Sequence, residues 1–210
     1  MLNEYFAMVR GVVAGNLDPV GASPAARLYG ELVAAQQRQV LRTLFAPVIA
    51  RIGPVRFEET FRSLRLESPP RDPNPSRWAG AFVAVLARAA GVDKHSLALA
   101  EFLALRVALS QDADIPWIGR AHPHARVVLF FADPRVALST PARYDATSPT
   151  LLAFVRDDQG TVRSYPVSGA ALAAWGLALG ESGAPELTRA MAPAQLRAGE
   201  RELLVLGMIR

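Results

Sequence analysis

Apolar residues recur three and four positions apart through the first half of the chain, and polar residues fill the positions between them. This spacing is typical of amphipathic helices. The repeats are interrupted at Pro47, which lacks an N–H and clashes with the preceding turn, and at Gly53 and Gly91. The pattern predicts helices near 2–15, 24–45, 47–53, 55–66, 75–91 and 94–110. The last of these is apolar on nearly every side, which is typical of the most buried helix of a bundle.

The pattern changes at about residue 111. Residues 111–125 have no periodicity, and the runs at 126–131, 135–140, 150–156 and 161–167 indicate strands. Asp157-Asp158-Gln159-Gly160 joins the last two runs and predicts a hairpin, because glycine supplies the positive φ of a tight turn. Three helices should follow: one capped by Ser168 and ending at Gly180, one near 185–191 and one over 194–208. We expect LLVLGMI in the last helix to be buried.

These elements predict an α+β fold with two domains. An all-α helical bundle should occupy residues 1–118. A small antiparallel sheet with a hairpin, followed by three helices, should occupy residues 125–210. We expect this second domain to be either peptide-recognition-element-like or winged-helix-like. A proline-rich stretch at 68–76 is expected to be an extended connector inside the first domain.

Composition narrows the class of protein. Hydrophobic residues make up 51% of the chain, yet no run reaches the roughly 18 uncharged apolar residues of a membrane span. Glu4 and Arg10 interrupt the apolar pattern of the first residues, so we expect no signal peptide, no membrane association and a cytoplasmic location. The absence of cysteine excludes disulfides, thiolate catalysis and cysteine-ligated metals.

The distribution of charge is only weak evidence that the protein binds nucleic acid. The sequence pI is about 10.1, but the net charge is only +4. Lys94 is the only lysine among 23 basic residues, so almost no basic group titrates before arginine does. The arginines are spread singly rather than gathered into a basic run. The pI therefore overstates the basicity.

No group of residues has the spacing of a catalytic or metal site. His122 and His124 flank a proline with no nearby carboxylate cluster, so we interpret them as an exposed loop rather than metal ligands. Asp157 and Asp158 suit turn chemistry. We predict no enzymatic activity, no cofactor and no bound metal.

Three aromatic residues are candidates for a partner interface: Trp117, Tyr29 and Trp78. Trp117 lies in an irregular segment beside Pro116, where an exposed aromatic side chain could anchor a partner. For Tyr29 and Trp78, packing in the core or against the proline-rich connector is the favoured alternative.

Five segments together resemble the HvfC/BufC type of bacterial protein, a group often described as DNA-binding that includes the partner subunit of methanobactin biosynthesis. They are RLYGELV, LFAPVIARIG leading to Phe57, ESPPRDPNPSRWAGAFVAVL, ALAEFLALRVAL and TLLAFVRDDQGTVRSYPVSGAALAAWGLALGES. The resemblance implies a non-catalytic partner that forms a heterodimer with a multinuclear non-haem iron oxidative enzyme. The pair would bind and modify a ribosomally made precursor peptide in natural-product (RiPP) biosynthesis.

Two functions therefore remain open. In the first, an edge strand between residues 126 and 167 accepts the precursor peptide as an added strand, with Arg156, Arg163 and Tyr165 nearby. In the second, the C-terminal segment is a winged-helix-like module that binds DNA. A winged helix usually places its hairpin after the helices and exposes a polar recognition helix. Peptide recognition is the favoured interpretation, because in this chain the predicted hairpin precedes the C-terminal helices.

Overall fold

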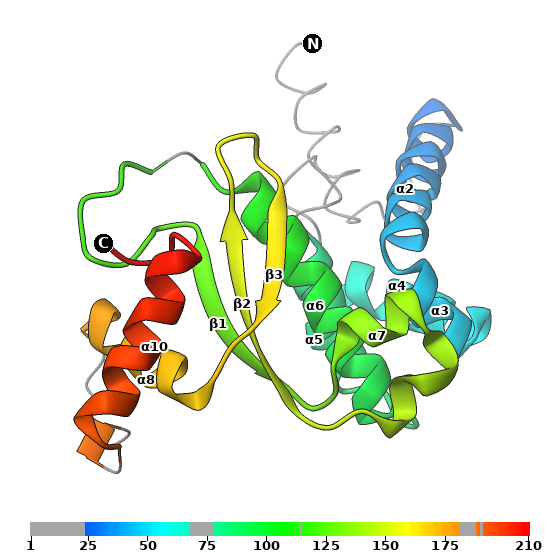
Figure 1. The fold of residues 1–210 in the computed structure, drawn as a ribbon. Helices are drawn as coiled ribbons and strands as arrows, with labels where there is room; N and C mark the ends of the chain where they lie inside the picture. Colours follow the sequence, from blue (N-terminus) through cyan, green and yellow to red (C-terminus); the bar gives the residue numbers. More distant parts are fainter. Residues whose placement is uncertain (1–23, 68–77, 114, 181–187, 190) are drawn as a thin grey trace. The chain divides into compact units, whose positions relative to one another are not determined.

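The computed structural model describes residues 24–67, 78–113, 115–180, 188–189 and 191–210 (Figure 1). The chain divides into two compact units, with the boundary between Ala108 and Leu109. The boundary predicted from sequence lay further along, between 118 and 125. The predicted first helix, the proline-rich connector and most of the predicted helix near 185–191 lie outside the described residues.

The first unit is helical in its described part. Its elements are α2 (Pro24–Leu44), α3 (Ala46–Ile52), α4 (Pro54–Glu67), α5 (Ala79–Leu86) and the greater part of α6 (Lys94–Gln111). α6 starts as its sequence indicates, because an Asp93 carboxylate oxygen accepts a hydrogen bond from the Ser96 backbone N–H at 2.8 Å. Among the described residues, no helix is long and apolar enough to cross a membrane.

Stacked phenylalanines form the core of this first unit. Phe82 of α5 is fully buried, with its ring centroid 4.7 Å from that of Phe45 and 5.6 Å from that of Phe57. Phe57 also stacks on Phe61, one helical turn further along α4, at 6.4 Å. The spacing that predicted these helices thus brings aromatic residues from three segments together.

The second unit contains a three-stranded antiparallel sheet in the order β1-β2-β3. The strands are β1 (Ala125–Phe130), β2 (Thr150–Arg156) and β3 (Val162–Pro166). The hairpin between β2 and β3 is confirmed, and Gly160 has the positive φ of 77° that the turn requires. Asp157 stabilises the turn, since its carboxylate accepts hydrogen bonds from the backbone N–H groups of Gln159 and Thr161.

One predicted strand is wrong. Residues 134–139 form the helix α7 (Pro134–Ser139), which is followed by the 3₁₀ helix η2 (Pro141–Ala146). Asp133 caps α7, because its side chain accepts a hydrogen bond from the Arg135 N–H at 3.0 Å, and Pro134 occupies the first helical position. These two start signals outweigh the short apolar run that suggested a strand.

Helices α8 (Gly169–Leu179) and α10 (Pro193–Val205) follow the sheet and pack on one of its faces (Figure 1). Ser168 caps α8 as predicted, with its hydroxyl oxygen accepting from the Ala171 N–H at 3.1 Å. The two helices cross closely at Gly199, where an added Cβ atom would lie 2.3 Å from the backbone of Ala170. The shared core contains residues from all these elements: Ala125, Ala153, Ala171, Ala174, Trp175, Leu203, Met208 and Ile209. The predicted order of helices, sheet and helices is therefore confirmed.

The prediction that LLVLGMI is buried is wrong in part. Leu203, Met208 and Ile209 are buried, but Leu204 is 49% exposed and Val205 is 86% exposed. Successive residues of a helix point in directions about 100° apart, so this run cannot face the core throughout. Gly207, with a φ of 68°, then turns the chain back so that Met208 and Ile209 reach the core.

Candidate functional site

β3 lies at an edge of the sheet and pairs only with β2 among the described residues. In an antiparallel pair, alternate residues direct both backbone polar groups toward the neighbouring strand. The Val167 N–H donates to the Leu151 carbonyl at 3.0 Å, and the Asp157 N–H donates to the Thr161 carbonyl at 3.0 Å. The odd-numbered residues of β3 therefore bond to β2.

The even-numbered residues of β3 direct their backbone polar groups away from β2. Val162 and Ser164 present an N–H and a carbonyl at this edge, whereas Pro166 presents a carbonyl alone. Proline is tolerated at such a position because the sheet needs no donor there. The edge thus offers alternating donors and acceptors to an added strand.

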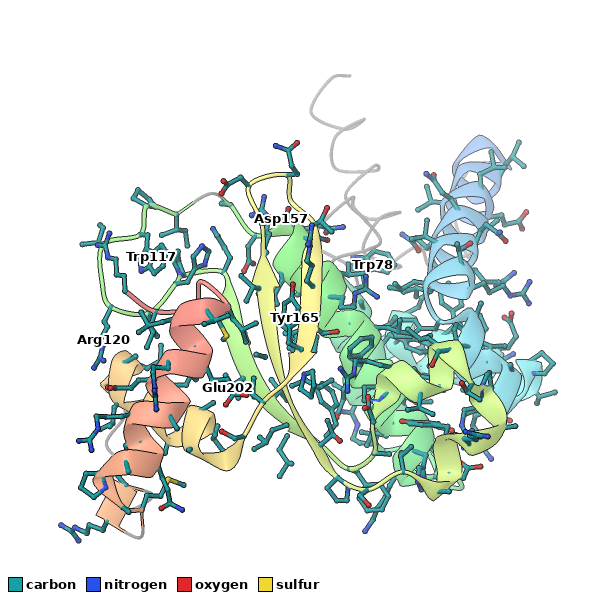
Figure 2. The ribbon with its side chains drawn as sticks, in the orientation of Figure 1. Trp78, Trp117, Arg120, Asp157, Tyr165 and Glu202 are labelled. Carbon is teal, nitrogen blue, oxygen red and sulfur yellow. The ribbon has the colours of Figure 1, made fainter. Side chains whose placement is uncertain are left out.

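A groove of about 520 Å³ lies beside this edge, between β3 and α10. It is lined by Tyr165, Pro166, Arg201, Glu202, Val205 and Leu206. Tyr165 of β3 and Glu202 of α10, one lining residue from each side of the groove, are labelled in Figure 2. The groove joins an apolar surface, dominated by the exposed Val205, to the free strand edge.

Arg201 and Glu202 bring one charge of each sign to the groove wall. The Glu202 carboxylate accepts hydrogen bonds from the Ser168 hydroxyl at 2.7 Å and from the Ser168 backbone N–H at 3.2 Å. Arg201 is exposed at the groove wall. Arg163 lies two residues before Tyr165 on the same face of β3, and its side chain is 64% exposed. Arg163 also lies 3.4 Å from the Asp157 carboxylate.

Arg156, the third predicted peptide-binding residue, is not part of this groove. It lies at the end of β2, where its guanidinium donates to the Asp112 carbonyl at 2.8 Å. It lines a second, polar cavity of about 420 Å³ together with Trp117, His122, His124 and the hairpin turn 157–160. The structure therefore brings Tyr165 to the groove and places Arg163 beside it on the same strand face, whereas Arg156 lines the other cavity.

The prediction that His122 and His124 form an exposed loop is wrong for His124, which is only 7% exposed. Its Nε2 atom accepts a hydrogen bond from the Ile115 N–H at 3.3 Å. His122 is half-buried, and its ring meets the edge of the Trp117 ring at 4.7 Å. Burial, together with neighbouring His124, lowers the pKa of His122 below its usual 6.5, although the Asp158 charge opposes this shift. Within the described parts of the chain, no three histidine or carboxylate side chains gather where they could hold a metal ion.

The predicted interface residues differ in environment. Trp117 is half-buried, and the Arg210 guanidinium lies 5.3 Å from its ring centroid. Its neighbour Ile118 is 83% exposed and is the more accessible apolar residue of this loop. Trp78 is 6% exposed and belongs to the core of the first unit, as the alternative interpretation held. Tyr29 lies in α2, but its side chain is outside the described part of the structure.

The α10 side of the groove, namely Arg201, Val205 and Leu206, was not predicted from the sequence. A signal was present, because a helix cannot bury four consecutive apolar residues such as 203–206 on one face.

Comparison with known proteins assigns no family: no family model matches the chain, and no curated protein matches it at a significant level. The candidate site therefore rests on the geometry of β3 and α10.

Proposed function

We propose that this chain is a non-catalytic recognition subunit that binds an extended precursor peptide along β3 and presents it to an oxidative enzyme formed by another chain. The observation that carries the proposal is the free edge of β3 beside an open groove. An extended peptide added to a sheet edge gains affinity from main-chain hydrogen bonds, while neighbouring pockets select its side chains.

The groove supports a particular kind of peptide. An apolar side chain of the peptide would cover Val205, which is 86% exposed, and would contact Leu206 and Tyr165. Acidic side chains flanking it would lie near Arg163 and Arg201. The expected ligand is therefore a short extended segment with an apolar residue among acidic ones.

The enzyme partner follows from the resemblance to HvfC/BufC-type proteins. That resemblance supports a heterodimer with a multinuclear non-haem iron oxidative enzyme in RiPP biosynthesis. Coexpression tests it: the two chains are expected to copurify as a stable 1:1 complex and to bury at least the roughly 1,200 Å² typical of specific interfaces. Separate elution of the two chains at micromolar concentration would exclude this partnership.

The main test of peptide binding is Ser164→Pro. Proline at this position removes the N–H that points away from β2 but leaves the bonds between β2 and β3 intact. Loss of one backbone hydrogen bond is expected to weaken binding by about tenfold. The measurement is fluorescence anisotropy with a labelled precursor peptide taken from a reading frame next to the gene. The matched control is Ser164→Ala, which keeps the N–H and should bind like the unchanged protein.

A second variant tests the groove wall. Val205→Asp places a carboxylate on an exposed site, so folding should be unaffected, but the apolar contact is lost. We expect the same peptide to bind about tenfold more weakly or worse, since an apolar side chain would then meet a charge. Equal peptide affinity of Val205→Asp, Ser164→Pro and the unchanged protein would refute binding at this edge.

The winged-helix-like alternative predicts a different result. A DNA-binding protein loses affinity steeply as salt rises from about 50 to 200 mM, because binding releases counterions from the phosphates. Tight binding to a duplex with that salt dependence, together with no binding to the peptide, would favour the DNA function over peptide recognition.

A further inference from the structure

A polar cavity of about 420 Å³ is lined by the loop 115–124 and by the hairpin turn 157–160. Both segments belong to the second unit, and Trp117 and Asp157, one lining residue from each, are labelled in Figure 2. A cavity of this volume is large enough for a small ligand, because such sites usually measure about 300–1,000 Å³.

The loop that lines this cavity is fixed to the rest of the unit. The His122 N–H donates to the Met208 carbonyl at 2.7 Å, and the Arg210 N–H donates to the Arg120 carbonyl at 3.1 Å. The Arg210 guanidinium also donates to the Ile118 carbonyl at 2.9 Å. This wall of the cavity is therefore preorganised, which reduces the entropy lost when a ligand binds.

Two buried N–H groups of lining residues have no acceptor in the described part of the chain. One is the indole N–H of Trp117. The other is on His124, whose Nε2 atom accepts from the Ile115 N–H at 3.3 Å, so that the proton of the neutral ring lies on the buried Nδ1 atom. The Asp112 carboxylate is 3.8 Å from this Nδ1 atom, which is beyond hydrogen-bond distance.

These two donors lie on the same part of the wall. The His122 ring centroid is 4.7 Å from that of Trp117 and 5.9 Å from that of His124, so His122 contacts both. Buried donors nearly always have a partner in native proteins, and a pair of unused ones beside a polar cavity indicates a bound acceptor.

The hairpin turn supplies a carboxylate to the same cavity. The Asp157 carboxylate already accepts the backbone N–H groups of Gln159 and Thr161. Asp158 also lines the cavity and is exposed. Burial lowers the pKa of His122, and the Asp158 charge opposes that shift, which places this carboxylate near the His122 ring. Asp158 can therefore accept a hydrogen bond from a molecule in the cavity.

Charges of opposite sign balance around the cavity. Arg156 lines it, and the Arg210 guanidinium lies 5.3 Å from the centroid of the indole ring in the loop. Asp112 and Asp158 oppose these two charges, while Asp157 is already paired with an arginine of β3 at 3.4 Å. A charged ligand would lose its hydration here without meeting a net opposite charge. An uncharged ligand that both accepts and donates matches the cavity better.

We propose that this cavity binds an uncharged carboxamide, whose carbonyl oxygen accepts from the N–H groups of Trp117 and His124 and whose NH₂ group donates to Asp158. A carboxylate only accepts and an amidinium only donates, whereas a carboxamide does both. Ile115 and Pro123 offer apolar contacts to the rest of the ligand. Among the described residues, the lining of this cavity and that of the groove beside β3 do not overlap, so the site does not depend on peptide binding.

Three probes of nearly the same shape test this proposal: benzamide, benzoate and benzamidinium. Each is titrated into the full chain and followed by ¹H–¹⁵N NMR. Benzamide is expected to bind saturably with a Kd on the order of 1 mM, as suits its size, and about tenfold more tightly than the two charged probes. The indole N–H of Trp117 should shift on binding, whereas that of Trp175 in the shared core should not.

Two variants test the assigned contacts. Trp117→Phe removes the indole N–H but keeps an aromatic ring, and should weaken benzamide binding about tenfold. Asp158→Asn removes one negative charge at an exposed position, so benzoate should bind more tightly and the preference for benzamide should fall about tenfold. The control Val205→Asp, in the groove beside β3, should leave benzamide binding unchanged.

The unchanged protein alone is sufficient to overturn the proposal. Shifts that do not saturate, equal affinity for the three probes, or tightest binding of benzoate or benzamidinium would each exclude a carboxamide site. Unchanged benzamide affinity in Trp117→Phe would remove the indole N–H from it. These outcomes leave peptide binding at β3 untouched, so the two proposals fail separately.

Discussion

Replacing Gly199 with alanine is expected to destabilise the second unit by about 3 kcal/mol, although alanine is the better helix former. A Cβ atom at position 199 would lie 2.3 Å from the backbone carbonyl carbon and oxygen of Ala170 and 2.6 Å from the Ala171 nitrogen. Overpacking of this kind usually costs about 1–3 kcal/mol, and here the obstacle is backbone that cannot rotate away. The gain in helix propensity, about 1 kcal/mol, is too small to offset it.

Thermal unfolding measures the effect. For a unit of this size each kcal/mol shifts Tm by roughly 4–8 °C, so Gly199→Ala should lower Tm by more than about 10 °C. The matched control is Gly169→Ala, in the first turn of α8, where an added Cβ has no atom within 4 Å. The control should leave Tm unchanged or raise it slightly. An unchanged Tm in Gly199→Ala would show that α8 and α10 do not cross closely at this point.

The same crossing matters for the groove. Gly199 lies in α10 six residues before Val205, and Glu202 between them bonds Ser168 at the start of α8. A displaced α10 would move Val205 and Arg201 away from Tyr165 and Pro166, the strand side of the groove. The small residue at position 199 thus supports both the stability of the unit and the shape of the proposed peptide site.

Local patterns were sufficient to predict most elements of this fold. Helical spacing identified the described helices of the first unit, and Ser168 and Gly160 marked a helix start and a turn correctly. The error at 134–139 has a local cause, because Asp133 and Pro134 start a helix there and were interpreted as a turn before a strand. Such signals depend on neighbouring residues, which is why sequence alone can reveal them.

The candidate site was harder to predict because it depends on contacts between distant residues. The register of β3 places Arg163 and Tyr165 on one face of the sheet. Arg156 was grouped with them by proximity in sequence, but the register pairs it with Val162, at the other end of β3 from Pro166. The burial of His124 likewise depends on packing between segments, which residue spacing does not report.

Phe82 lies in the core of the first unit. Phe82→Ala is expected to lower the free energy of unfolding of this unit by about 3–5 kcal/mol, the usual effect of removing a buried phenyl ring. Phe82 is 0% exposed, stacks on Phe45 and meets Phe57 at a tilt of 43°, so the cavity would be bounded by rings from two other helical segments. Neighbouring rings are too rigid to fill such a space.

Urea unfolding followed by circular dichroism can measure this loss as a shift in the transition midpoint. Phe82→Leu provides the graded comparison, because it keeps much of the volume and should lose clearly less stability than the alanine variant. Val55→Ala, at a site that is 71% exposed, should change stability by less than about 0.5 kcal/mol. If Phe82→Ala matched Val55→Ala, the stacked phenylalanines could not be the core of this unit. The ordering Val55→Ala, Phe82→Leu, Phe82→Ala, from least to most destabilising, is the result that burial and ring stacking require.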